Sequence, residues 1–115
     1  MRTSTQRSLL RACFPVGLAA IAVGAAVTAY SAQTGADVVI KNFDFSPMQV
    51  SIPAGGSVTW RNLDGEPHTV TSLDGLFRSG GLDQNDSFTF KFTKAGVYSY
   101  VCSIHPKMMA SVVVK

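Results

Sequence analysis

From residue 38 onward, hydrophobic and polar residues alternate in short runs separated by turn residues. In one run, Met48, Val50 and Ile52 fall on one side and Gln49 and Ser51 on the other. Alternation with a period of two is typical of half-buried β-strands, and no run has a helical period. Seven such strands predict an all-β fold, a Greek-key β-sandwich of about seven strands. The runs cover residues 38–41, 48–52, 57–62, 68–72, 87–93, 97–102 and 111–114.

The alternation also predicts which side chains face the core. Tyr98, Tyr100 and Cys102 share one face of their strand. We expect that face to be buried because it is continuous with the aromatic faces of other runs. Cys102 is then expected to point into one end of the sandwich. Tyr98 follows a turn at the position expected for a tyrosine corner.

Residues 1–36 have the organisation of a secretory signal peptide. A basic start with three arginines is followed by residues 12–30, which carry no charge, and by small residues. This order predicts cleavage after Ala29 or Ser31 and export of the domain 37–115 to the periplasm. The alternative is an uncleaved segment that tethers the domain to the outer face of the inner membrane, because the uncharged stretch is close to the length of a membrane span.

The charge of the chain is concentrated in this N-terminal segment. The formal net charge is +3, and the three arginines of the predicted signal peptide account for the excess. The domain that follows is therefore nearly neutral. A neutral domain lacks the basic surface that nucleic acids require, so we expect no nucleic-acid partner.

The cysteines and histidines indicate a metal site. Cys13 lies in the predicted signal peptide, so Cys102 is the only cysteine of the domain, and a lone thiol in an oxidising compartment suggests metal coordination. His105 and Met108 follow Cys102 closely, and His68 is the only other histidine. Each of these residues, considered alone, is more simply interpreted as an ordinary core or loop residue. Together they match a blue-copper electron-transfer site, which predicts one copper ion cycling between Cu(I) and Cu(II).

The chain from residue 38 to residue 115 resembles the cupredoxins, most closely their amicyanin and plastocyanin-like branch. The most specific match is Cys-Ser-Ile-His-Pro-Lys-Met at 102–108, which has the ligand spacing of amicyanins. The resemblance implies that the equatorial ligands are His68, Cys102 and His105 and that the axial ligand is Met108. Plastocyanins have a longer gap, which neither Met108 nor Met109 fits. The other matching segments are 58–62, 66–70 and 92–100.

Three residues depart from the pattern of this family. Many relatives have asparagine after the first histidine ligand, where its side chain ties the two ligand loops together, but this chain has Thr69. The contacts around the ligands are therefore expected to be built differently. Ile104 replaces a frequent proline, and Lys107 replaces an aromatic residue of amicyanins. Both residues lie on the surface expected to face redox partners, so the resemblance does not define which partner docks there.

These features predict a monomeric one-electron carrier and not an enzyme, because no acid–base pair or substrate pocket is indicated. Redox proteins are expected to dock transiently near His105 and Pro106, with Ile104 and the 63–65 loop at the edge. The membrane is a partner only if the N-terminal segment is uncleaved. The main alternative is a periplasmic protein that stores or delivers copper, and a third is a copper-free interaction module.

Overall fold

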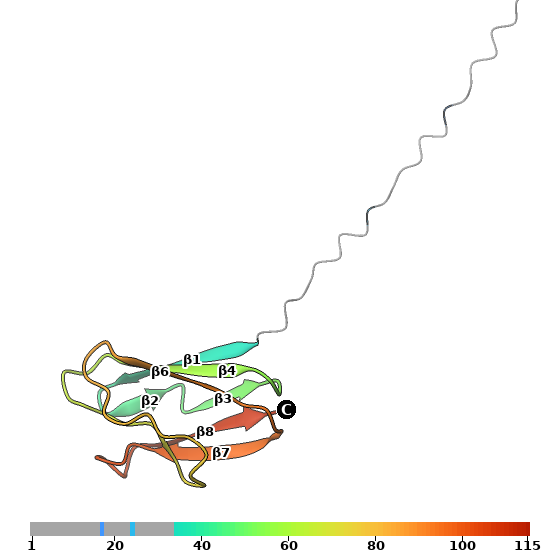
Figure 1. Ribbon diagram of the computed structural model, residues 1–115. Coiled ribbons are helices and arrows are strands. Elements are labelled where there is room, and N and C mark those ends of the chain that lie inside the picture. The colour runs from blue at the N-terminus through green and yellow to red at the C-terminus, as the bar shows by residue number, and fades with distance from the viewer. Residues whose placement is uncertain (1–16, 18–23, 25–33) are drawn as a thin grey trace, which may run out of the picture.

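Two four-stranded β-sheets pack face to face in the computed structural model, which describes residues 17, 24 and 34–115 (Figure 1). The described residues form eight strands and no helix, so the predicted all-β class is confirmed. The strands are β1 (Gly35–Lys41), β2 (Asp44–Ser46), β3 (Gln49–Ile52), β4 (Ser57–Asn62), β5 (Thr71–Ser72), β6 (Ser87–Lys91), β7 (Gly96–Val101) and β8 (Met109–Val114).

The chain crosses repeatedly between the two sheets. One sheet has the order β2-β1-β4-β6 and the other β3-β8-β7-β5. The pairs β1–β4 and β3–β8 are parallel, and the remaining neighbours are antiparallel. Only the β1–β2 and β7–β8 connections stay within one sheet. The connections from β4 to β5 and from β7 to β8 lie at the same end of the sandwich, because Thr69 of the first accepts the backbone N–H of Ser103 of the second at 2.7 Å.

Aromatic side chains fill the space between the sheets. Trp60 of β4 is fully buried and meets Tyr100 of β7 edge to face, with ring centroids 5.4 Å apart. Phe77 and Phe88 stack on the indole at 5.6 Å and 5.8 Å. Such pairs contribute about 0.5–1.5 kcal/mol beyond the area they bury. The predicted inward orientation of Tyr100 and Cys102 is confirmed, since both are fully buried.

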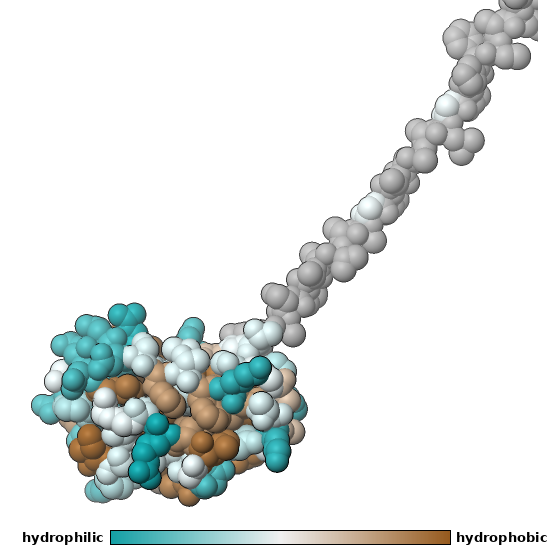
Figure 2. Space-filling model, in the orientation of Figure 1, coloured by the Kyte–Doolittle hydropathy of each residue, from teal (hydrophilic) through white to brown (hydrophobic). Residues whose placement is uncertain are grey.

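The two ends of the sandwich differ in what they carry. The start of β1 and the C-terminus lie at one end, and the β7–β8 connection lies at the other (Figure 1). Hydrophilic side chains gather near this second end, over the loops that follow β4 and precede β6 (Figure 2). The second end is also where β7 delivers Cys102. It is therefore the end to examine for the predicted metal site.

The strand count exceeds the predicted seven because the chain forms a tight hairpin after β1. Lys41 pairs with Asp44, and the two residues between them form the turn. Asn42 and Phe43 have φ values of 53° and 60°, which is the left-handed geometry of a type I′ turn. The returning strand β2 has three residues, too few for its alternation to be recognised in the sequence.

The orientation predicted for Met48 is wrong. Val50 and Ile52 are buried as their alternation requires, but Met48 is 64% exposed. Met48 precedes the first paired residue of β3, Gln49, which pairs with Ser111. Alternation orients side chains only within a paired strand, so it does not constrain Met48.

The strand predicted over 68–72 is shorter than expected. Only Thr71–Ser72 forms a strand, β5, which pairs with β7. His68 instead makes an isolated bridge to Leu82. The backbone N–H of Val70 donates to the Ser79 side chain at 2.8 Å. The segment before β5 therefore pairs with the long loop after it and not with a sheet strand.

The tyrosine corner is confirmed. The hydroxyl of Tyr98 donates to the carbonyl oxygen of Lys94 at 2.7 Å. This bond lies at the turn that leads into β7, so it fixes the start of the strand that ends at Cys102. One additional hydrogen bond of this kind contributes about 0.5–1.5 kcal/mol.

The predicted signal peptide lies almost entirely outside the described residues. Strand β1 already begins at Gly35, ahead of the predicted domain start at Asp37. Cleavage after Ala29 or Ser31 would leave β1 intact. Within residues 17, 24 and 34–115, there is no helix of the length and hydropathy needed to cross a membrane.

Candidate metal centre

Three potential ligand atoms meet at the end of the sandwich that carries the β7–β8 connection. They belong to His68, Cys102 and His105, and all lie within 4.8 Å of one another. Cys102 Sγ is 3.8 Å from His68 Nδ1 and 3.6 Å from His105 Nδ1. His68 and Cys102 are fully buried, whereas His105 is half-buried. The structure thus brings together the histidines and cysteine singled out in the sequence, although residues 34 positions apart contribute to the group.

These separations fit one metal ion. First-row metal ions bind imidazole nitrogen at about 2.0 Å and thiolate sulfur at about 2.3 Å. In a trigonal arrangement, those bond lengths separate nitrogen from sulfur by about 3.7 Å. The observed values of 3.6 Å and 3.8 Å lie on either side of this distance. A trigonal His₂Cys set is the arrangement that copper adopts in electron-transfer sites.

His68 is held in place through its backbone and its ring. Its N–H donates to the carbonyl of Leu82 at 3.0 Å, and its own carbonyl accepts the N–H of Leu82 at 2.7 Å. The ring nitrogen Nε2 lies 2.8 Å from Oδ2 of Asp64. A carboxylate paired with Nε2–H leaves Nδ1 unprotonated and directed at Cys102, which is the tautomer that a metal ligand requires.

Asp64 connects this histidine to the β1–β2 hairpin. Its carboxylate accepts the backbone N–H groups of Asn42 at 2.7 Å and Phe43 at 3.0 Å. Burial raises the pKa of Asp64, but the two N–H donors and His68 outweigh that effect and hold the pKa below its ordinary value. Sequence reasoning missed Asp64. Asp64 and His68 are an i,i+4 pair, and such a spacing predicts a contact in a helix but not in a loop.

The ligand loop 102–108 is closed by its own backbone. Cys102 N–H donates to the carbonyl of Met108 at 3.1 Å, which joins the two ends of the loop. Inside the loop, His105 N–H donates to the Cys102 carbonyl at 3.1 Å and Met108 N–H to the His105 carbonyl at 2.9 Å. These three bonds constrain the loop through its own backbone. Met108 is only 5% exposed and Met109 is 51% exposed, so Met108 is the methionine on the inner side.

Thr69 joins the two ligand segments, which is the task expected of asparagine in relatives. Its hydroxyl oxygen accepts the backbone N–H of Ser103 at 2.7 Å and lies 2.8 Å from the Ser103 hydroxyl. Its backbone N–H donates to Cys102 Sγ at 3.3 Å. The expectation of a different arrangement at this position is therefore confirmed: a threonine hydroxyl ties the segments together.

The same hydrogen bonds prepare the thiol to bind a cation. Burial raises the pKa of Cys102, because a charged thiolate is poorly solvated in the interior. The N–H of Thr69 and the rings of His68 and His105 stabilise the thiolate more strongly. Together they lower the pKa from 9.0 to about 6. A thiolate is the form that binds metals, so the site has the right charge for one.

Phe43, from the β1–β2 turn, is a further residue that sequence reasoning missed. Its ring lies edge to face against His68 and His105, with centroids 5.1 Å and 5.0 Å away and interplanar angles of 88° and 89°. The two imidazole centroids are themselves 5.1 Å apart. Three rings thus form a compact triangle at the outer side of the site.

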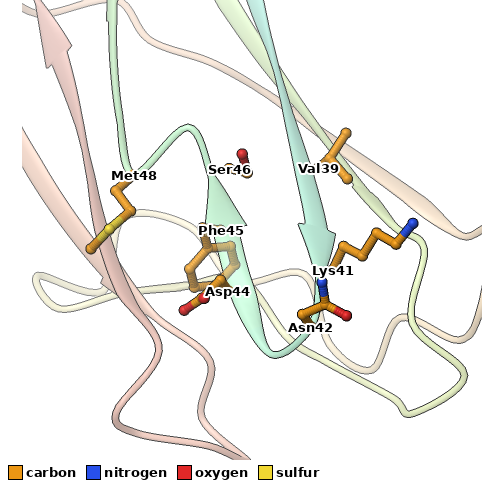
Figure 3. Close-up of a pocket in the computed structure, with 7 residues that line it drawn as sticks. All are labelled: Val39, Lys41, Asn42, Asp44, Phe45, Ser46 and Met48. Carbon is orange, nitrogen blue, oxygen red and sulfur yellow. The ribbon is translucent and has the colours of Figure 1, made fainter.

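A surface hollow lies beside the hairpin but is separate from this centre. It has a volume of about 530 Å³ and is shown in Figure 3. None of the candidate ligands lines it, and its walls are side chains of β1, β2 and the residues next to them. The lining residues are Val39, Lys41, Asn42, Asp44, Phe45, Ser46 and Met48.

The fold and the donor set together define a small copper-binding β-sandwich protein. A family model described as a cupredoxin-like domain matches residues 15–114. Amicyanin-alpha from Methylorubrum extorquens is 35% identical over 108 residues, which cover 84% of this chain and 87% of that protein. The chain therefore belongs to the cupredoxin family, the blue copper proteins.

Solved structures agree with this assignment. The purple cupredoxin from Nitrosopumilus maritimus has a TM-score of 0.65 and 35% identity, covering 70% of this chain and 99% of that chain. A mutant amicyanin in its Cu(I) form has a TM-score of 0.67 and 27% identity, covering 70% and 82% respectively. The cofactor of the present protein is copper, and its class of function is electron transport.

Proposed function

We infer that the protein is an exported, mononuclear type 1 copper protein that carries single electrons between redox proteins. The equatorial ligands are His68, Cys102 and His105, and the axial ligand is Met108. The observation that carries this proposal is the convergence of two Nδ1 atoms on one buried sulfur at 3.6 Å and 3.8 Å. Copper bound there supplies reversible one-electron chemistry between Cu(I) and Cu(II).

The residues around the site suit an electron carrier because they resist rearrangement. The ligand loop is closed by backbone hydrogen bonds, and Asp64 holds the His68 ring at 2.8 Å. A site with fixed ligands changes little when the metal changes charge. That rigidity lowers the energetic cost of each electron transfer, and it argues against a protein whose task is to release copper.

His105 is the most accessible of the candidate ligands, so we assign it as the point where electrons enter and leave. It is half-buried, while His68 and Cys102 are fully buried. Pro106 and Ile104 flank it, and Ile104 is 52% exposed. Partner proteins would dock transiently here, with the 63–65 loop at the edge, through a small interface of the kind used by weak redox complexes.

Titration with Cu(II) tests the metal centre. The purified domain should develop an intense blue or green colour with one equivalent of copper, and Cys102→Ser should remain pale because the thiolate is the source of the intense absorption. The matched control is Ser103→Ala, which changes the neighbouring residue and should keep the colour. A wild-type domain that stays colourless at one equivalent of copper would contradict the proposal.

Two measurements separate an electron carrier from a copper-delivery protein. The copper form should exchange electrons rapidly and reversibly at an electrode, with little separation between the oxidation and reduction peaks. The Cu(I) form should release its ion only slowly to a chelator. Slow electrode kinetics together with prompt transfer of Cu(I) to the chelator would instead identify delivery as the function.

A further inference from the structure

Phe43 occupies a backbone position that does not suit its side chain. The turn 42–43 is a two-residue type I′ turn, with Lys41 paired to Asp44 on either side. Both central residues of such a turn need positive φ, so the favoured pair is Asn-Gly. Asn42 fits the first position at φ 53°, but Phe43 at φ 60° stands where glycine is favoured. A bulky residue in this region is strained, and such outliers concentrate at functional sites.

The backbone contacts of Phe43 do not explain why the residue is phenylalanine. Its N–H donates to Asp64 Oδ2 at 3.0 Å, and glycine would supply the same donor. Nor is the side chain a core residue, because 46% of it is exposed. What phenylalanine adds is the ring, and the ring lies edge to face against both imidazoles, at 5.1 Å from His68 and 5.0 Å from His105.

The ring also lies on the side of the site that is open to solvent. His68, Cys102 and Met108 are buried by the sandwich, whereas His105 is half-buried. Small ligands must therefore approach from the His105 side. The Phe43 ring packs against the half-buried His105 as well as against His68 and is itself 46% exposed, so it is placed to narrow that approach.

We propose that Phe43 is a shield and a positioning residue of the copper centre, retained in a strained turn because its ring holds the two histidines and excludes external ligands from the metal. The proposal rests on the proposed function, since it assumes that the two histidines bind copper. The hairpin turn contributes no ligand, but under this proposal it keeps external ligands away from the copper.

Phe43→Gly tests the proposal because it relieves the backbone strain of the turn and removes the ring that shields the copper. Stability and ligand access should therefore respond differently. The metal-free variant should unfold at the same temperature as the wild type or higher, since glycine tolerates the turn. Its Cu(II) form should bind azide with a midpoint concentration at least about tenfold lower than that of the wild type, measured by the change in the visible spectrum. Phe43→Tyr should restore the wild-type azide response, because the ring is kept.

Asn42→Gly is the matched control. It relieves the neighbouring positive φ and leaves the ring in place, so its azide response should equal that of the wild type. An azide midpoint in Phe43→Gly within twofold of the wild type would overturn the proposal, as would a loss of stability of the metal-free variant. A wild-type protein that gains no colour with Cu(II) would contradict the proposed function itself, and the metal-free stability comparison would still test the strain at Phe43.

Discussion

Asp64 Oδ2 lies 2.8 Å from His68 Nε2, and the same carboxylate accepts two backbone N–H groups from the turn at 42–43. One carboxylate therefore holds both the buried histidine and the hairpin that covers it. The contact determines the tautomer of the ring, because a hydrogen on Nε2 leaves Nδ1 free to bind metal. It also places a negative charge next to a histidine that we propose as a copper ligand.

Asp64→Asn should raise the reduction potential of the copper form. The nearby negative charge stabilises Cu(II) more than Cu(I), so its removal favours the reduced state. An electrostatic effect of about 1 to 2 kcal/mol corresponds to roughly 40 to 90 mV for one electron. Cyclic voltammetry measures the shift. Asp44→Asn removes an exposed charge from the same hairpin and should change the potential less; a lower potential in Asp64→Asn would contradict the assigned charge effect.

Thr69→Val should destabilise the metal-free protein by about 1–3 kcal/mol, because it leaves the Ser103 N–H without its acceptor. Valine has nearly the same shape as threonine, so the decrease in the free energy of unfolding reports the removal of the hydroxyl. Chemical denaturation measures the free energy of unfolding. Thr69→Ser keeps the hydroxyl and should lose much less. Equal losses in the two variants would show that the methyl group, and not the hydrogen bond to Ser103, matters.

The thiol of Cys102 should make the stability of the metal-free protein depend on pH. Its pKa is lowered from 9.0 to about 6 in the folded state, so folding releases a proton between these pH values. The resulting stabilisation is fully present above pH 9, declines as the pH falls, and is absent below about pH 6. Thermal unfolding of the wild type and of Cys102→Ser across this range measures it.

The wild type should gain stability relative to Cys102→Ser as the pH rises from 6 to 9. Because both proteins share every other titratable group, the difference between them isolates the thiol. In the folded wild type, the ultraviolet absorbance of the thiolate should rise with a midpoint near pH 6, which is the lowered pKa of Cys102. A difference in unfolding temperature that stays constant over this range would contradict the lowered pKa.

The two methionines at the end of the ligand loop should behave differently. Met108→Gln should keep the intense colour but lower the reduction potential, because a soft sulfur that favours Cu(I) is replaced by an oxygen or nitrogen. Met109→Gln should leave both properties unchanged, since that side chain is 51% exposed. Spectroscopy and voltammetry of the copper forms measure the effects. The opposite pattern would identify Met109 as the axial ligand.

The sequence predicts the parts of this centre that follow from periodicity and spacing. Alternation in the strand before Cys102 determines that its side chain points inward, and the structure buries it completely. The same alternation places Trp60 and Tyr100 in the core, where their rings meet. Trp60 and Tyr100 follow the alternation because they lie inside paired strands, which tie the orientation of each side chain to that of its neighbours. Cys102 is one residue beyond β7, and it keeps the pattern because its N–H bonds to the Met108 carbonyl at 3.1 Å and so extends the pairing with the segment before β8.

The contacts that surround the ligands could not be predicted in this way. Asp64 and Phe43 meet His68 only because the hairpin of one sheet folds over the β4–β5 connection. These contacts join loops, where no period relates one residue to the next. Met48 shows the same limit, since it stands just outside β3 and turns to solvent. Tertiary packing determines these positions.

His68 and Cys102 are 34 positions apart, and the connections that carry them belong to different parts of the sandwich. An ion bound to both would close that stretch of chain into a ring, as a disulfide does between two cysteines. Constraining a loop of this length in the unfolded chain stabilises a protein by roughly 3 to 5 kcal/mol. Copper in this small domain would then act as a covalent-like crosslink between segments distant in sequence, and the holoprotein would withstand heat that unfolds the metal-free chain.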